Sequence, residues 1–86
     1  MPGPMSPMVR HKFTLMLDQD PEPFLEELKT AGCGDALFWV SDDGAPLAQF
    51  YRKAPTLARA MATAVIEIEK TELKVIRLAG VALPNN

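Results

Sequence analysis

Apolar and polar residues alternate along the first regular part of the chain. Phe13, Leu15 and Leu17 fall on one face of an extended segment, while Met16 falls on the other face with polar neighbours. A period of two is typical of a strand with one buried face. The pattern therefore predicts a half-buried strand at 10–17.

The apolar period changes to helical spacing after an acidic, proline-containing segment. Asp20 can cap a helix, and Pro21 suits the first helical position because its missing N–H is not needed there. Phe24 and Leu28 then lie one helical turn apart, and Gly32 can end the helix in a left-handed conformation. We expect a short helix of about three turns.

Two further strands are predicted on either side of a turn. Residues 36–41 include Phe, Trp and Val, which favour strands, and residues 47–53 form a second segment of this kind. The sequence DDG at 42–44, followed by Ala45 and Pro46, is typical of a turn. We therefore expect the two strands to form a hairpin.

An apolar stripe with helical spacing follows the hairpin. Its members are Leu57, Met61, Ala64, Val65 and Ile68. Pro55 and Thr56 precede the stripe and predict the start of a helix. Residues 73–78 predict a last strand, which we expect to end at Gly80.

The predicted order of elements is strand, helix, strand, strand, helix, strand. With right-handed crossovers, this order gives an α+β ferredoxin-like βαββαβ sandwich, a four-stranded antiparallel sheet with two helices on one face. The 86 residues leave room for one domain. We place this domain at 10–80, between a flexible leader at 1–9 and a C-terminal tail at 81–86.

Two helices on one side of a sheet leave its other face uncovered. Alternation places Met16 on that face, together with Trp39 or Phe38 on the second strand and Tyr51 or Phe50 on the third. Large apolar groups on an open sheet face are often covered by a second subunit, although isolated exposed apolar residues are also normal. We take Met16, Trp39 and Tyr51 as the candidate interface residues.

Charged residues are unevenly distributed along the chain, which has a net charge of −2. Residues 18–43 contain a single basic residue, Lys29, among many acidic residues. In residues 44–62, every charged residue is basic. This asymmetry predicts either two differently solvated faces or a polarised surface that docks a partner or a second copy. The acidic balance gives no general attraction to phosphate, so we expect no direct nucleic-acid binding.

Residue usage also bears on the compartment of the protein. No apolar run reaches the ~18 residues that are needed to cross a bilayer, so we expect no membrane partner. The single cysteine, Cys33, cannot form an internal disulfide, and we therefore expect a cytoplasmic protein.

Cys33 is also the residue that raises the question of nucleophilic or metal chemistry. A nucleophilic cysteine needs a base, and the only histidine, His11, belongs to the first strand. The predicted first helix ends just before Cys33, where its negative partial charge raises a thiol pKa. Asp42 and Asp43 occupy a predicted hairpin tip, where solvent keeps carboxylates ionised. We therefore predict a packing role for Cys33, and no catalytic, cofactor-binding or metal-binding residues.

Four segments, FTLML, LKTAGCGDALF, FYRKAPTLARAMATAVIEIE and LKVIRLAG, resemble the N-terminal domain of a family of small bacterial proteins. The residues that carry the resemblance are Gly32, Cys33, Asp35, Ala36, Arg52, Ala54, Pro55, Ala60, Ala64, Ile68 and Glu69. The resemblance extends over residues 12–79 and implies no activity for the domain. Members of the family often carry a helix-turn-helix after it. After Leu78 this sequence reads AGVALPNN instead, so we expect a fragment of a longer protein or a version without its own DNA reader.

These observations support one leading hypothesis and two alternatives. We expect a non-enzymatic interaction and dimerisation module, which associates through its sheet face or an edge strand, as a homodimer or with another protein. The first alternative is a small-ligand sensor domain. The second is the non-DNA-reading half of a helix-turn-helix regulator, with a role in transcription regulation.

Overall fold

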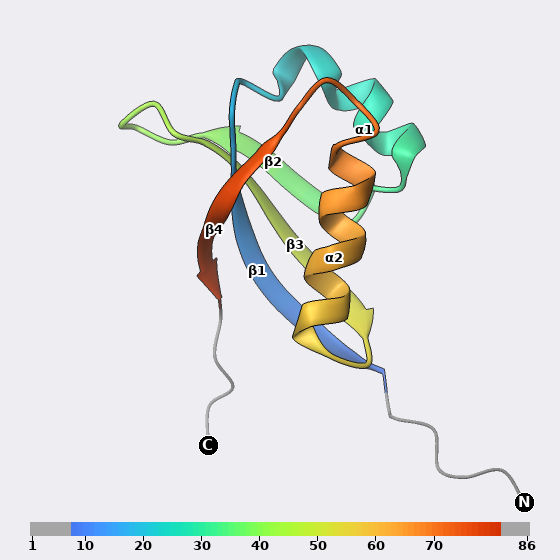
Figure 1. Cartoon of the computed structure of the whole chain (residues 1–86). Coiled ribbons are helices and arrows are strands. Elements are labelled where there is room, and N and C mark those ends of the chain that lie inside the picture. The colour runs from blue at the N-terminus through green and yellow to red at the C-terminus, as the bar shows by residue number, and fades with distance from the viewer. Residues whose placement is uncertain (1–7, 82–86) are drawn as a thin grey trace, which may run out of the picture.

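The computed structural model of the chain describes residues 8–81 (Figure 1). Its elements are β1 (Val9–Leu17), a 3-10 turn (Glu22–Phe24), α1 (Leu25–Ala31), β2 (Ala36–Val40), β3 (Pro46–Ala54), α2 (Leu57–Ile68) and β4 (Val75–Val81). Their order confirms the predicted order of strands and helices. Most of the predicted leader and tail, residues 1–7 and 82–86, lies outside the described residues, whereas Val9 and Val81 belong to strands.

The four strands form one antiparallel sheet in the order β2-β3-β1-β4. The central strands β1 and β3 pair along most of their length, with Phe13 opposite Phe50 and Leu15 opposite Ala48. Both helices lie on one side of this sheet (Figure 1). The α+β ferredoxin-like fold that the order of elements predicts is therefore confirmed.

The hydrophobic core fills the space between the sheet and the two helices. Phe13 and Phe50 stack within it, with ring centroids 5.5 Å apart. α2 turns the small side chains of Ala60 and Ala64 toward the sheet, which lets the helix approach closely. The core also contains Leu15, Leu17, Leu28, Cys33, Ala48, Ala54, Ile68 and Leu73. One small core thus stabilises the whole domain, as expected for a chain of this length.

The ends of both helices follow local signals in the sequence. Thr56 caps α2, because its Oγ1 accepts a hydrogen bond from the Arg59 N–H at 3.1 Å. Gly32 ends α1 in the left-handed region with a φ of 112°. Asp20 Oδ1 accepts a hydrogen bond from the Glu22 N–H at 2.9 Å, but the turn that begins there is a 3-10 turn rather than α-helix. Two prolines in this segment lack the N–H groups that an α-helix would use.

β4 begins and ends later than the sequence predicts. Leu73, the expected first residue, is instead buried in the turn after α2, where its N–H donates to Thr71 Oγ1 at 3.0 Å. The strand continues through Gly80, the expected stop, because that residue pairs with Thr14 of β1. Two register shifts against β1 accommodate the additional residues. Pairing with the neighbouring strand, rather than local propensity, therefore sets the bounds of β4.

Candidate functional site

The sheet face opposite the helices, here called the open face, contains the candidate interface residues Met16, Trp39 and Tyr51. The sequence leaves open whether Trp39 or Phe38, and Tyr51 or Phe50, lies on this face. Phe50 is fully buried, and Phe38 packs edge-on against it with ring centroids 6.3 Å apart. Successive strand residues alternate between faces, so Trp39 and Tyr51 lie on the open face, where they are 39% and 53% exposed.

Met16 and Trp39 belong to one apolar row that crosses three strands. Leu47 of β3 pairs with Met16 of β1 on one side and with Trp39 of β2 on the other. Leu37 extends this apolar area along β2 and is 66% exposed. Tyr51 lies apart from the row, since the strand between it and Leu47 spans about 13 Å. We call Met16, Leu37, Trp39 and Leu47 the apolar half of the open face.

The other half of the open face is basic. Tyr51 pairs with Lys12, and the next pair on this face is Arg10 with Lys53. The Arg10 guanidinium lies 5.2 Å from the centre of the Tyr51 ring, within the range of a cation–π contact. Acidic residues of α1 lie in the helix layer on the other side of the sheet. The uneven charge of the sequence does not become a simple division between two sides, because Lys53 lies on the open face whereas Arg52 lies on the covered face and Arg59 belongs to α2.

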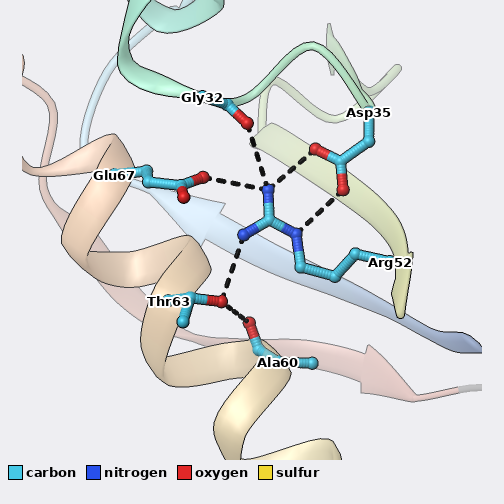
Figure 2. A network of polar contacts seen from close by, with 6 residues as sticks. All are labelled: Gly32, Asp35, Arg52, Ala60, Thr63 and Glu67. Atoms are coloured by element: carbon cyan, nitrogen blue, oxygen red, sulfur yellow. Dashed lines mark hydrogen bonds and ion pairs between the residues drawn. The ribbon is translucent and has the colours of Figure 1, made fainter. Parts of the chain in front are cut away.

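A second cluster of polar side chains, shown in Figure 2, surrounds Arg52 on the covered face. Only 12% of the Arg52 side chain is exposed. Its Nε and Nη2 atoms donate to Asp35 Oδ2 and Oδ1 at 2.8 and 2.7 Å. Nη2 also donates to Glu67 Oε1 at 3.0 Å, and Nη1 donates to Thr63 Oγ1 at 3.1 Å. The network therefore joins β3 to α2 and to the loop before β2.

Two carboxylates offset the burial of the Arg52 charge. Burial lowers the pKa of the guanidinium, but the hydrogen bonds to Asp35 and Glu67 outweigh this effect and raise the pKa above its usual value. The guanidinium also lies 4.8 Å from the centre of the Phe50 ring. The Arg52 guanidinium therefore donates to Asp35, Glu67 and Thr63 of its own chain, which fits a structural role.

The turn at Gly32 and Cys33 is part of this cluster. The φ of 112° at Gly32 disfavours other residues, and a Cβ there would stand 2.9 Å from Glu67 Cδ. The Gly32 carbonyl also accepts a hydrogen bond from Arg52 Nη2 at 3.4 Å. Glycine at this position thus lets Glu67 reach Arg52. Gly32, Cys33, Asp35 and Arg52, which carry the resemblance noted in the sequence, lie together in the folded chain.

Cys33 is buried, with 2% of its surface exposed. Its N–H donates to the Leu28 carbonyl at 2.9 Å at the end of α1. Burial and, secondarily, the negative charge of Glu67 raise the pKa of the thiol to about 11. The thiol is therefore protonated at neutral pH, and a protonated thiol is a poor nucleophile. The Nε2 atom of His11 lies 3.1 Å from the Ala54 carbonyl oxygen, which gives this side chain a partner of its own.

The β2–β3 hairpin tip contains the two remaining candidates for acid–base chemistry, Asp42 and Asp43, and both are exposed. The Ser41 hydroxyl donates to Asp43, whose Oδ1 also accepts a hydrogen bond from the Ala45 N–H at 3.3 Å. The hydrogen bond from Ser41 lowers the pKa of Asp43. Gly44, with a φ of 88°, completes the turn. Asp43 is therefore ionised and shapes the hairpin.

The local sequence pattern does not predict the Arg52 cluster. Arg52 belongs to the run of bases at 44–62, although it follows the buried Phe50 by two residues. Strand alternation alone therefore places Arg52 on the covered face, where a charge needs partners. Asp35 and Glu67 are distant in the sequence, and no local signal identifies them as those partners.

Other features of the described chain are limited. Within residues 8–81, no group of three or more His, Cys, Asp or Glu side chains is placed to hold a metal ion. None of the helices that the structure describes is long and apolar enough to span a membrane. A shallow hollow between α1 and the turn after α2 is lined by Glu26, Glu27, Thr30, Ala31, Lys70 and Thr71. Comparison of the chain with protein-family models, with curated proteins and with solved structures found no match.

Proposed function

We propose that the chain is a non-enzymatic interaction module that forms a homodimer through the open side of its sheet. The observation that carries this proposal is the apolar half of the open face, which continues to the exposed edge of β2. Leu37 and Trp39 are large apolar side chains that remain in contact with water there. Complete burial of a fully exposed side chain of this kind is worth about 1.5–3 kcal/mol, so a second copy that covers the exposed parts of Leu37 and Trp39 gains a fraction of this value for each.

A second copy of the chain fits the apolar half of the open face. Two-fold symmetry places the same surface on both sides of a dimer interface, so that apolar side chains meet apolar side chains. The bases of the open face near Tyr51 lie in the other half. They can stay in water at the rim when the apolar half is covered, which is the usual arrangement of an interface.

The state of the groups capable of chemistry supports a non-enzymatic role. The Cys33 thiol is buried and has a pKa of about 11. Arg52 donates to Asp35, Glu67 and Thr63 of its own chain. Each of these groups holds a turn or joins two layers of the fold.

Sedimentation equilibrium of the 86-residue chain tests the proposal. We expect a monomer–dimer equilibrium for the wild type. Trp39→Ala should weaken the dimer by about tenfold or more, because it removes an aromatic side chain from the centre of the contact. Tyr51→Ala is the matched control, since Tyr51 is an exposed aromatic residue on the same face outside the apolar half. A wild-type chain that stays monomeric, or equal effects of the two substitutions, would contradict the proposal.

A further inference from the structure

We infer that the second copy pairs with this chain along β2, so that the two sheets form one continuous sheet. This inference rests on the proposed homodimer and specifies its contact. The two β2 strands run antiparallel and are related by a two-fold axis at Phe38. Three features carry the inference: the difference between the two sheet edges, the backbone groups that β2 leaves free, and the charges of the open face.

β2 is the edge strand without protection against pairing with another chain. Ala36–Val40 contains no charged residue, proline or glycine, and it pairs with β3 without a register shift. At the opposite edge, β4 contains Arg77 and has two register shifts against β1. Charges and bulges are features by which natural sheets prevent edge-to-edge association. They are present in β4 and absent from the five residues of β2.

The hairpin turn determines which backbone groups of β2 face outward. The Ser41 N–H donates to the Ala45 carbonyl, and the Gly44 N–H donates to the Ser41 carbonyl, each at 2.9 Å. Ser41 therefore directs its backbone groups toward β3. In an antiparallel ladder this direction alternates from one residue to the next. The even-numbered residues of β2 consequently direct their N–H and C=O groups away from β3, toward the free edge.

Phe38 and Val40 thus present both a donor and an acceptor to a partner strand. Ala36 presents its carbonyl, while its N–H donates to the Cys33 carbonyl at 3.1 Å. An unprotected row of donors and acceptors at a sheet edge is a template for another strand. The row on β2 is centred on Phe38, the middle residue of the strand.

A two-fold axis at Phe38 brings these groups into register. Phe38 faces Phe38 of the second copy as a hydrogen-bonded pair, and the Val40 N–H donates to the carbonyl of Ala36 of the second copy. Trp39 then lies opposite Leu37 of the second copy in a non-hydrogen-bonded pair, where side chains approach most closely. Both residues belong to the apolar half of the open face, so the register joins the two apolar halves.

In the same register, no charged residue of 33–43 lies directly opposite another. Asp35 lies opposite Ser41 of the second copy, and Asp42 lies opposite Gly34. Complete stacking of the two open faces, including their basic halves, would instead place bases of one copy near bases of the other. The charged residues that strand pairing places on this face are Arg10, Lys12, Lys53 and Arg77. Like charges in contact disfavour association, so the geometry favours pairing at the edge, where the basic halves stay in water, over complete stacking of the two faces.

Amide hydrogen exchange of the wild-type chain, followed by NMR over a range of protein concentrations, tests the strand pairing. The Phe38 and Val40 amides should exchange at least about tenfold more slowly in the dimer than in the monomer. The Leu37 and Trp39 amides, bonded to β3, should be protected in both states, and the β4 amides should not change. A dimer in which Phe38 and Val40 exchange at the monomer rate would refute the pairing and leave the homodimer standing. A chain that remains monomeric would refute both.

Cysteine cross-linking tests the register, at a protein concentration high enough to offset the weaker association expected of substitutions in the contact. Leu37→Cys and Trp39→Cys place thiols directly opposite each other in a mixture of the two variants, with Cα atoms about 4.5 Å apart, which suits a disulfide. In each variant alone, the two equivalent thiols lie diagonally, about 7–8 Å apart. Mild oxidation should therefore yield mainly the mixed disulfide, identified by mass. Preferential cross-linking within either variant alone would contradict the register. The buried Cys33 thiol, with a pKa of about 11, serves as an internal unreactive control.

Discussion

An arginine beside an aromatic ring occurs on both faces of the sheet, with different consequences. On the covered face, Arg52 lies 4.8 Å from the centre of the Phe50 ring and bonds to two carboxylates. On the open face, Arg10 lies 5.2 Å from the centre of the Tyr51 ring, and that ring remains largely in water. Burial, rather than residue type, decides whether such a pair stabilises the fold or stays accessible on the surface.

Removing each arginine in turn should give the largest difference between the two faces. Arg52→Ala leaves two half-buried carboxylates without their partner and should lower the free energy of unfolding by about 2–3 kcal/mol, between the values for exposed and buried pairs. Arg10→Ala should cost less than about 1 kcal/mol, because the pair that it breaks is exposed. Urea denaturation measures both values. Equal losses of unfolding free energy in the two variants would mean that the buried Arg52 network stabilises the fold no more than the exposed Arg10 contact does.

The two glycines on either side of Cys33 offer a second contrast. Gly32→Ala should destabilise the chain by about 1–3 kcal/mol, because φ is 112° and the new Cβ would press on Glu67. Gly34→Ala is the control, since its added Cβ would meet nothing within 4 Å, and we expect a change within about 0.5 kcal/mol. Thermal or urea unfolding distinguishes them, and similar losses for both would contradict the role assigned to Gly32.

A smaller, pH-dependent effect should arise from Cys33 on the covered face. Burial raises the pKa of its thiol from 9.0 to about 11, so the folded state holds this proton more tightly than the unfolded chain. Its contribution to stability is complete below pH 9.0 and is lost as the pH rises toward about 11. The stability advantage of the wild type over Cys33→Ala should therefore shrink over this range. Urea midpoints of the two proteins measured at several pH values test this prediction. A stability difference that stays constant over this pH range would contradict it.

Much of the covered face could be predicted because its signals are local. The alternation of Phe13, Leu15 and Leu17 predicts β1, and the apolar stripe after Thr56 predicts α2. Gly32 marks the end of α1 through its own backbone preference. Each of these signals depends on a few consecutive residues, and the structure confirms them.

The remaining features depend on contacts between distant parts of the chain. The apolar run of β2 fits either face, and only its pairing with β3 turns Phe38 inward and Trp39 outward. The ion pair of Arg52 with Glu67 joins a strand to a helix. The end of β4 at Val81 likewise depends on pairing with β1 and not on its own sequence. Such features follow from the three-dimensional arrangement, which local patterns do not specify.

A comparison of substitutions at the two edges of the sheet tests most directly whether the chain forms a dimer through β2. Leu37 and Ile76 are exposed apolar residues of similar exposure, 66% and 59%, on opposite edges of the sheet. Sedimentation equilibrium should show dimers for the wild type and for Ile76→Lys, and monomers for Leu37→Lys. A dimer that survives Leu37→Lys but is lost in Ile76→Lys would contradict the account.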